Sequence, residues 1–581
     1  LEEQNIFILD ESNLDAEQGE FVRHFFSEKV RPDLFPLMVD IYTDLQTLKD
    51  ATIHLAIDLK SKDDKIKRQF ALITVPTDKL SRFIILPEKD GKKYLILLDD
   101  VIRYCLDDIF SVFGYDYYKA YTIKFTRDAE MDIDNDVSKS FLELMTESVK
   151  QRKKGEPVRF VYDEKIPEDL LKLLMKKFNI RKRDNIRAGG RYHNFKDFMG
   201  FPDLGRKDLK YPPSPPLPHK DLAPNTSIID VLKQRDIMLH YPYQSFHYII
   251  DLLREASIDP LVKAIKMTFY RAAEGSSVMN ALINAARNGK QVTVFMELQA
   301  RFDEEANIYW TNKLQEEGIK IIQTIPGFKV HSKLLQIRRK EDGENVYYAN
   351  ISTGNFNEST AKVYADDSLL TGNQAITTEV NKVFHLFESK FIMPTFNNLI
   401  IAPFNIRKLF MEMLDKEIQN ASEGKEAWAI LKMNSLSDKT IAKKVYEAAK
   451  AGVKLKMIVR GICIIDPGDD DIYEELEAFS IVDKYLEHSR VFIFCNDGDN
   501  KYYIGSADWM PRNFDHRVEV VCPILDPNIR KELWDMMQIQ LKDNTQARYL
   551  SRKDMNKYRT TGDNYQHRAQ FEIYDYFKAK L

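Results

Sequence analysis

The chain has 581 residues, more than one hydrophobic core usually supports, so its length predicts several domains. Hydrophobic residues make up 44% and charged residues 30%, the composition of a soluble globular protein. The apolar runs are too short for a membrane-spanning helix, and the net charge of −4 excludes a uniformly basic nucleic-acid binder.

The cysteines are few and scattered. Cys105, Cys463, Cys495 and Cys522 include no CxxC pair, which argues against a disulfide scaffold and against a cysteine zinc site. The first thirty residues show no secretory signal. We therefore expect a cytoplasmic protein, with peripheral membrane association as an option. The chain begins at Leu1 rather than Met, as a fragment or a processed product would.

The N-terminal third mixes helical and strand patterns. Residues 16–29 and 138–154 have helical periodicity, and residues 51–59, 70–76 and 118–126 have strand character. This mixture predicts an α+β head domain over residues 1–210.

A basic segment lies within this region. Residues 150–191 hold fourteen Lys or Arg against six Asp or Glu, a net charge of +8 in an acidic protein. Such a block could attract a polyanion. Alternatively, Lys172, Lys176 and Lys177 form the solvated face of a helix whose other face carries leucines. The sequence does not decide between these interpretations.

Prolines then gather in KYPPSPPLPH, residues 210–219. Proline fixes φ and removes a backbone donor, so this segment cannot be helix or central strand. We place a stiff linker at residues 211–219.

Beyond the linker the chain repeats itself. AARNGKQVTVFMEL (285–298) resembles AAKAGVKLKMIVRG (448–461), each reading as a helix end, a glycine cap and a buried strand. The segments around His331 and His488, and those around Gly354 and Gly505, match in the same order. Collinear matches predict a duplication. We expect residues 220–400 and 401–581 to be two α/β domains packed face to face.

Each repeat places a histidine in a strand-like segment, two residues before a cation. Side chains at i and i+2 of a strand share a face, so His331 should emerge with Lys333, and His488 with Arg490. An imidazole is a nucleophile toward phosphorus, and a cation beside it can hold phosphate oxygens. In one shared cleft, one histidine could attack while the other handles a proton. The alternative, two hydrogen-bonded core histidines, is the weaker interpretation because both occur in register.

This doubled pattern resembles the phospholipase D superfamily, whose signature is HxKxxxxD in both halves. Here Arg338 and Cys495 stand at the two acidic positions, and Arg490 replaces the second lysine. The missing acids argue against ordinary phosphodiester hydrolysis.

The departures match a narrower family. The segments, in chain order, are MTFYR (267–271), MELQARFDEEANI (296–308), GFKVHSKLL (327–335), STGNFNESTAKVYADDSLLT (352–371), KMNSLSDK (432–439), IVRGICIIDPG (458–468), EHSRVFIF (487–494) and IGSADWMPRN (504–513). Together they resemble polyphosphate kinases of the long, phosphohistidine-forming type. The resemblance covers essentially the whole chain, including head domain and linker. The small helical N-terminal domain of that family is missing, so we expect the chain to start at the head domain.

The resemblance implies an ATP:polyphosphate phosphotransferase. ATP gives its γ-phosphoryl group to His331, which passes it reversibly to the end of an inorganic polyphosphate chain. Histidine, with an ordinary pKa near 6.5, is largely neutral at cytosolic pH, as a nucleophile must be. By motif position His488 binds phosphate and protonates the leaving oxygen, while Tyr364 and Arg460 contact the nucleotide.

Two further arginines stand just past the carboxyl ends of predicted strands, where α/β folds bind ligands: Arg271 and Arg301. The resemblance associates both positions with Mg²⁺. Because arginine has no lone pair to give a metal, we expect both to clamp phosphates that bridge Mg²⁺. A surface ion pair is the alternative for either one.

Weaker candidates for the ATP and phosphate site follow from nearness in sequence. They are Lys333, Arg490, Asn355 and Arg517. The partners implied are ATP or ADP and polyphosphate, with no nucleic acid and no integral membrane segment, and the resemblance suggests a dimer through the head domain. A phospholipase D-like phosphodiesterase or nuclease, or a non-catalytic polyanion-binding homologue, stays open as an alternative.

Overall fold

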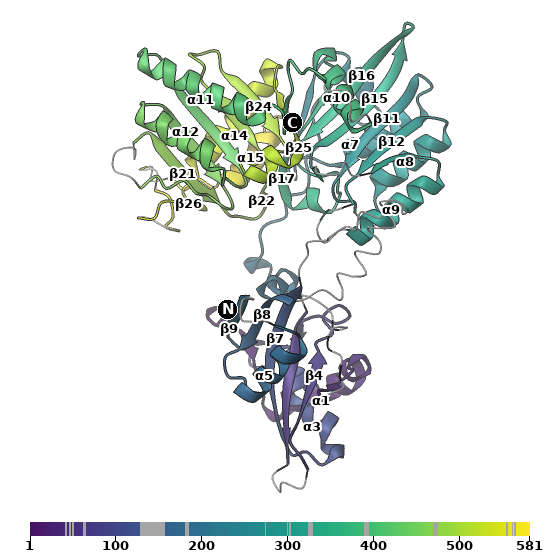
Figure 1. Cartoon of the computed structure of the whole chain (residues 1–581), viewed down its shortest axis with the longest axis vertical. Coiled ribbons are helices and arrows are strands. Elements are labelled where there is room, and N and C mark those ends of the chain that lie inside the picture. Colours follow the sequence, from purple (N-terminus) through teal and green to yellow (C-terminus); the bar gives the residue numbers. More distant parts are fainter. Residues whose placement is uncertain are drawn as a thin grey trace. The chain divides into compact units, whose positions relative to one another are not determined.

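A computed structural model describes the chain except for residues 41–42, 44, 46–47, 49–51, 62–65, 128–156, 181–184, 274, 299, 301–303, 324–328, 389–393, 469–473, 554–555, 561 and 563–564. The described residues form two compact units, Leu1–Lys210 and Tyr211–Leu581 (Figure 1).

The first unit combines helices with two sheets, in the strand orders β1-β6-β5 and β2-β4-β3-β7-β8-β9. The strands are β1 (Ile6–Leu9), β2 (Leu37–Met38), β3 (His54–Lys60), β4 (Gln69–Thr74), β5 (Phe83–Ile85), β6 (Lys93–Leu97), β7 (Tyr117–Arg127), β8 (Pro157–Asp163) and β9 (Asn185–Gly189). The helices are α1 (Ala16–Phe25), α2 (Leu98–Tyr104), α3 (Leu106–Phe110) and α5 (Glu168–Lys177).

These elements confirm the helix predicted from residue 16, as α1, and the three predicted strands, as β3, β4 and β7. The helix predicted at 138–154 lies outside the described residues.

The described part of the basic segment 150–191 includes α5. Leu170 and Leu174 are buried, whereas Lys172 is exposed and pairs with Glu168 at 2.6 Å. This favours the solvated helix face at Lys172, whereas Lys177 donates to the carbonyl of Thr43 at 3.1 Å. Residues 150–156 and 181–184, with half of the segment's cations, lie outside the described residues.

Residues 211–219 contain neither helix nor strand apart from an isolated bridge between Leu217 and Gln244. The prolines explain this, because they cannot donate to a helix or a sheet ladder.

The second unit begins with a sheet in the order β10-β17-β16-β15-β11-β12-β13. Its strands are β10 (Ile237–Tyr241), β11 (Val262–Phe269), β12 (Gln291–Met296), β13 (Lys320–Gln323), β15 (Lys333–Glu341), β16 (Glu344–Ser352) and β17 (Tyr364–Thr371). β11, β12 and β13 run parallel, and β15, β16, β17 and β10 add antiparallel neighbours.

A second sheet follows the same plan in the order β25-β24-β23-β19-β20-β21-β26, with β18 also paired to β25. Its strands are β18 (Ile400–Ala402), β19 (Trp428–Met433), β20 (Lys454–Val459), β21 (Leu476–Ile481), β23 (Val491–Phe494), β24 (Lys501–Gly505), β25 (Arg517–Pro523) and β26 (Ala547–Tyr549). β19, β20 and β21 are the parallel strands here.

Helices accompany both sheets (Figure 1). They are α6 (Ile228–Leu232), α7 (His247–Ile258), α8 (Ser277–Arg287), α9 (Glu304–Glu316), α10 (Gln374–Glu388), α11 (Ile406–Ser422), α12 (Lys439–Lys450), α13 (Pro511–Asp515), α14 (Pro527–Lys542) and α15 (Ala569–Lys578).

The predicted repeat of helix, glycine and buried strand is confirmed at both places. Ser276 caps α8 and Asp438 caps α12. Gly289 and Gly452 follow the helices with φ of 76° and 90°, the left-handed conformation that glycine adopts without steric cost. β12 and β20 come next, with Leu455 among the buried side chains of β20.

Two short strands cross between the sheets. β14 (Lys329–Val330) pairs in parallel with β25 of the second sheet, and β22 (Leu486–Glu487) pairs in parallel with β17 of the first. The strand that follows each of them in the chain, β15 or β23, belongs to the other sheet.

A common core joins the sheets. One buried cluster contains Leu334 of the first sheet, Val380 of α10, Ile493 of the second sheet and Leu533 of α14. Because such side chains exclude water from both sheets at once, the crossing strands are anchored in a single apolar interior.

Candidate active site

Both histidines lie at the points where the chain crosses between sheets. His331 follows β14, and the backbone amides of His331 and Ser332 both donate to the carbonyl of Val518, each at 3.0 Å. His488 follows β22, and its amide and that of Ser489 both donate to the carbonyl of Ala365, at 3.0 and 2.9 Å. The prediction that each histidine sits within a strand is therefore wrong in detail, because the ladder is interrupted there.

The ring of His331 is held by a buried acid. Its Nδ1 lies 2.9 Å from Oε2 of Glu519, whose side chain is fully buried on β25. Ser506 and Asn513 donate to the same carboxylate. A proton on Nδ1 satisfies Glu519, which leaves the lone pair on Nε2. Among the described residues, none hydrogen-bonds to Nε2 of His331.

Burial and charge keep His331 neutral. Burial lowers the pKa of His331 well below its ordinary value, and the cations Lys333, Arg517 and Arg490 lower it further. Burial also lowers the pKa of Lys333 and raises that of Glu519. The neutral form is the nucleophilic form of an imidazole.

Tyr270 links the surrounding cations. Its ring meets the ring of His331 edge-on at 4.8 Å between centroids. Lys333, Arg271 and Arg517 lie 5.6, 5.9 and 6.0 Å from the Tyr270 centroid, in the range of cation–π contacts. One aromatic ring at the end of β11 thus gathers three predicted site residues around His331.

His488 has the corresponding arrangement. Its Nδ1 lies 2.8 Å from Oδ1 of Asp366, a buried acid on β17, and Nη1 of Arg490 lies 3.2 Å from its Nε2. The ring of Tyr364 packs at 5.2 Å. Burial lowers the pKa of His488, Asp366 raises it, and Arg490 lowers it. Without substrate, a neutral His488 accepts from Arg490, so it needs added negative charge nearby before it can donate a proton.

The carboxylate of Asp366 packs against Gly354, where a side chain would clash with it. Thr353 Oγ1 donates to Asp366 at 2.6 Å, and a Cβ on Gly354 would lie 2.3 Å from the same carboxylate. A larger residue at position 354 would displace the acid that orients His488.

The two histidines share one electrostatic environment. Arg490, beside His488, also lowers the pKa of His331, and Lys333, beside His331, also lowers that of His488. Arg490 is held by Asp508 at 3.1 Å. Since such effects require proximity, both imidazoles lie near the same cations.

Side chains just after β12 and β20 hydrogen-bond to the backbone of the residue before each histidine. Oε2 of Glu297 accepts from the amide of Val330 at 3.0 Å. Nε of Arg460 donates to the carbonyl of Glu487 at 2.8 Å, and Asn434 accepts from Arg460. Glu297 and Arg460 thus hold the crossing strands at equivalent points.

Most predicted site residues come together. His331, Lys333, Arg271 and Arg517 gather at Tyr270, while His488, Arg490, Tyr364 and Arg460 form the second group. Asn355 follows Gly354, and its Oδ1 is buried without a hydrogen-bond partner among the described residues. Arg301 lies outside the described residues.

Several site residues were not predicted from the sequence. They are Glu519, Asp366, Asp508, Tyr270, Glu297 and Asn434. A signal existed for the two acids that hold the histidines: each stands thirteen residues after a hydroxyl residue, Thr353 or Ser506, in matching segments.

The described residues contain no group of three or more His, Cys, Asp or Glu side chains that could hold a metal ion. Their helices include none with the length and apolar character needed to span a bilayer.

The fold and this cluster define an α/β protein with paired histidines set among cations, a class of site suited to phosphate. Family models match residues 17–201 (polyphosphate kinase middle domain), 227–392 (polyphosphate kinase C-terminal domain 1) and 399–570 (polyphosphate kinase C-terminal domain 2). The chain belongs to the polyphosphate kinase family.

Individual relatives agree. The chain is 46% identical over 580 residues to polyphosphate kinase of Escherichia coli K12, covering 99% of this chain and 84% of the relative. It is 46% identical over 579 residues to that of Vibrio vulnificus YJ016, covering 99% and 82%. The crystal structure of polyphosphate kinase from Porphyromonas gingivalis aligns with a TM-score of 0.85 at 35% identity, over 100% of this chain and 86% of that one.

Proposed function

We infer that the chain, as a member of this family, is a polyphosphate kinase, a phosphotransferase. We propose that it transfers the γ-phosphoryl group of ATP reversibly to the end of an inorganic polyphosphate chain, with His331 as the phosphorylated residue. The observation that carries the proposal is the His331 ring, which Glu519 holds at Nδ1 and which packs against Tyr270, the ring that Lys333 and Arg517 also contact.

In the first step, Nε2 of His331 attacks the γ-phosphorus as the bond to the β–γ bridging oxygen breaks, and ADP leaves. Lys333, Arg517 and Arg490 would neutralise the equatorial oxygens, the main demand of phosphoryl transfer. The triphosphate brings negative charge beside His488 and draws Arg490 away, which favours proton uptake by His488 and donation to the leaving oxygen.

In the second step, a terminal oxygen of polyphosphate attacks phosphorus and the N–P bond breaks, which restores neutral His331. An anhydride replaces an anhydride, so the reaction runs in both directions. His488, held by Asp366, can take the proton of an entering oxygen.

Mg²⁺ would enter with the phosphates of ATP, as part of the substrate. Arginine has no lone pair for a metal, so Arg271 and Arg301 are proposed as clamps on the phosphate oxygens that Mg²⁺ bridges. The cation-rich lining around Tyr270 fits such a complex, because it matches phosphate oxygens rather than a bare cation. Tyr364, Arg460 and Asn355 are proposed as further ATP contacts.

The finer architecture remains part of the proposal. We assign residues 1–210 to a head domain that mediates dimerisation, 211–219 to a linker, and 220–400 and 401–581 to duplicated phospholipase D-like domains. The matching strand orders of the two sheets and the crossing of β14 and β22 support the duplication. A cytoplasmic location, with or without peripheral membrane contact, stays an expectation.

The test is direct labelling. Incubation with γ-labelled ATP and Mg²⁺ should give acid-labile, base-stable label on the protein, and His331→Ala should give none. His24→Ala, which removes an exposed histidine of the first unit, is the control and should label normally. Label that persists in His331→Ala would contradict the assignment, and diester hydrolysis without ATP would favour a phosphodiesterase.

A further inference from the structure

A second cation-lined cavity lies in the first sheet of the second unit. Its volume is about 530 Å³, and its charged lining residues are Lys266, Lys290, Lys320, Arg338, His385 and Glu388. Lys266 lies on β11, Lys320 on β13 and Arg338 on β15, and Lys290 directly precedes β12. These four strands are neighbours in the sheet. Gln, Thr and Asn side chains make up much of the remaining lining.

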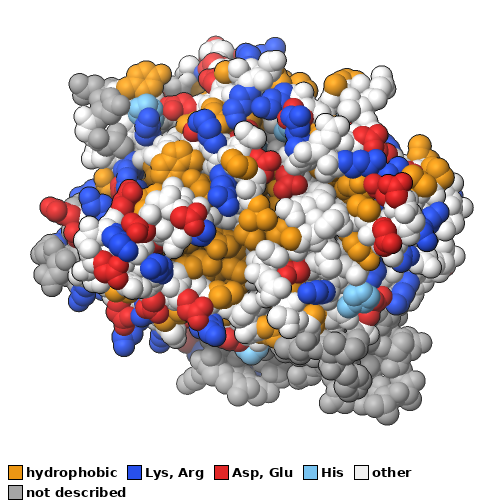
Figure 2. Space-filling view, turned by 90° about the horizontal axis from the view of Figure 1, so that it is seen from above, with side chains coloured by type: hydrophobic (Ala, Val, Ile, Leu, Met, Phe, Trp, Pro, Cys, Tyr) orange, Lys and Arg blue, Asp and Glu red, His pale blue; other side chains and the backbone are white. Residues whose placement is uncertain are grey.

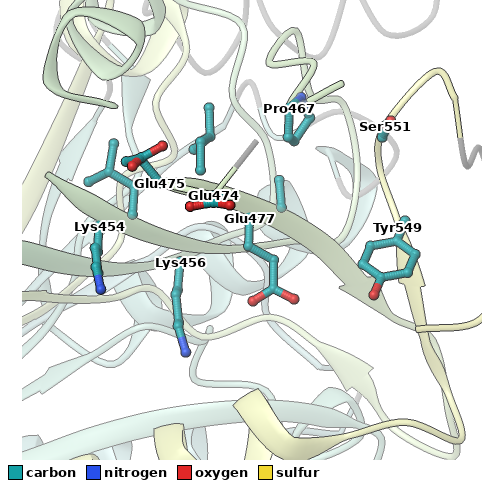
Figure 3. A pocket seen from close by; sticks show the side chains of 11 residues that line it. Lys454, Lys456, Pro467, Glu474, Glu475, Glu477, Tyr549 and Ser551 are labelled. Atoms are coloured by element: carbon teal, nitrogen blue, oxygen red, sulfur yellow. The ribbon is translucent and has the colours of Figure 1, made fainter. Parts of the chain in front are cut away.

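The charge of this cavity is strongly one-sided. On the face shown in Figure 2, basic and acidic side chains are interspersed. The cavity drawn in Figure 3, about 260 Å³ in volume, has Lys454 and Lys456 beside Glu474, Glu475 and Glu477, so its acids outnumber its bases by one. The larger cavity instead sets three lysines and one arginine against one acid.

That acid does not neutralise the site. Glu388 lies 2.8 Å from Nζ of Lys320 and 3.5 Å from that of Lys266. Nη2 of Arg338 donates to Gln291 at 3.2 Å, while its Nε is buried without a partner among the described residues. Burial lowers the pKa of Lys266 despite Glu388, and Lys320 and Arg338 contribute to the lowering. The cations therefore repel one another, and a bound anion would relieve that repulsion.

The cavity is separate from the histidine site. Arg338 stands five residues after Lys333 on the same strand, a separation of roughly 16 Å at about 3.3 Å per residue. Arg338 also occupies the place at which the phospholipase D signature has its acid. In this chain the signature position therefore holds a cation, on the strand that begins beside His331.

We propose that this cavity is a second anion site, which binds a short run of linked phosphates and anchors the polyphosphate chain away from the reacting end. The inference rests on the proposed function for the identity of the polymer. Linked phosphates fit because they place several charges in a small polar volume, where lysine and arginine donate charge-assisted hydrogen bonds. ATP carries the same phosphate chain, so the experiment must separate the two sources.

Lysine footprinting on the unaltered protein tests the site. Each lysine is acylated at low reagent concentration and quantified by mass spectrometry, with and without tripolyphosphate. We expect at least threefold protection of Lys320 and Lys266, and none of Lys408, which is 77% exposed on α11 and serves as internal control. Equal protection by sulfate at matched ionic strength would overturn the proposal, since it would show only screening. Stronger protection by ATP than by tripolyphosphate would reject the polymer as the occupant.

A variant supplies the second arm. Lys320→Gln with Arg338→Gln removes two charges without reversing any, and Lys408→Gln is the matched control. We expect the KM for long polyphosphate, measured with ADP as acceptor, to rise about tenfold, while labelling of His331 by ATP stays within twofold of the parent rate. An unchanged KM, or a loss of labelling, would overturn the separate site. Absence of label in the parent protein would instead refute the proposed function and leave the footprint standing.

Discussion

At the scale of single residues, the site depends on two buried acids that each fix one tautomer of a histidine. Glu519 accepts a hydrogen bond from Nδ1 of His331, and Asp366 accepts one from Nδ1 of His488. Both acids follow hydroxyl donors, Ser506 and Thr353, that hold them in place. The chemistry therefore rests less on the histidines alone than on which nitrogen each presents.

The lowered pKa of His331 predicts an unusual pH profile. A depressed histidine pKa keeps the ring neutral below the ordinary value near 6.5, so the nucleophile should lose activity only in more acid solution. In single-turnover experiments quenched in base, the rate of protein labelling should stay constant from pH 8 to below 6.5. A half-maximal rate at or above pH 6.5 would show that His331 is not shielded in this way.

Glu519 should be a positioning residue for His331. In Glu519→Ala the ring loses its Nδ1 partner and both tautomers become available, so labelling should slow by about 10²-fold or more. Glu519→Gln keeps an oxygen that can accept from Nδ1 and should recover part of the rate. ATP affinity should change little in either variant.

The matched control is Glu412→Ala, which removes an exposed acid from α11. A Glu519→Ala protein that labels at the parent rate, with an unchanged melting temperature, would remove Glu519 from the mechanism.

Residue patterns could locate the histidines and their cations, because these stand in short motifs that recur within the chain. They could not locate the acids, since Glu519 is 188 positions from His331 and Asp366 is 122 positions from His488. Such partners meet only when strands from different parts of the chain pair. Arg338 and Cys495 stand where the phospholipase D signature has acids, and the acid that holds each histidine comes from the opposite sheet.

At the scale of elements, helices and buried strands could be predicted from periodicity and glycine caps, as α8 with β12 and α12 with β20 show. The interruption of the strand at each histidine could not be predicted in this way. The segment VHSKLL carries apolar residues on both sides of His331 and gives no sign of a change of sheet, yet the chain leaves the second sheet after Val330 and joins the first at Lys333. Periodicity reports which side chains are buried, not which sheet buries them.

The contact between Glu297 and the crossing strand β14 can be tested. The carboxylate of Glu297 accepts from the amide of Val330, inside the protein and one residue before His331. Glu297→Ala should leave that buried amide unsatisfied, at a cost of about 1–3 kcal/mol, and allow β14 to shift on β25. We expect slower labelling of His331 with little change in ATP affinity.

Glu297→Gln provides the control, because its amide oxygen can still accept from Val330. Recovery of most of the labelling rate in Glu297→Gln would support a role in holding the strand. Equal losses in the Ala and Gln variants would mean that the negative charge, rather than the hydrogen bond, is what matters.

At the scale of the whole second unit, the two sheets are joined by charge as well as by the apolar core. His240 on β10 is fully buried, with Nδ1 2.6 Å from Asp367 on β17 and Nε2 3.0 Å from Glu532 on α14. Lys580, beyond the end of α15, binds the other oxygen of Glu532 at 2.7 Å. This chain of contacts runs from the first sheet to the C-terminal helices, and Asp367 adjoins the acid that holds His488.

This network predicts a pH-dependent stability. Burial opposes a charge on His240, but the hydrogen bonds that His240 donates to Asp367 and Glu532 outweigh it and raise the pKa of His240 to about 9. A raised pKa stabilises the fold fully below the unfolded value near 6.5, and this stabilisation is lost as pH rises through about 9. The difference corresponds to about 3 kcal/mol. The free energy of unfolding should therefore fall between pH 6.5 and 9 in the parent, and His240→Gln should lack that component while melting lower at pH 6.5.

Comparison of the two proteins across the pH range cancels the titration of other groups, and His247→Gln, an exposed histidine at the start of α7, controls for the substitution itself. Parallel stability curves for parent and His240→Gln would show that His240 is neutral in the folded protein. The sheets would then be held together without this charge. Since Asp366 and Asp367 are adjacent on β17, we also expect the His240→Gln protein to lose labelling activity at temperatures below its melting transition, as the acid behind His488 loosens before the fold does.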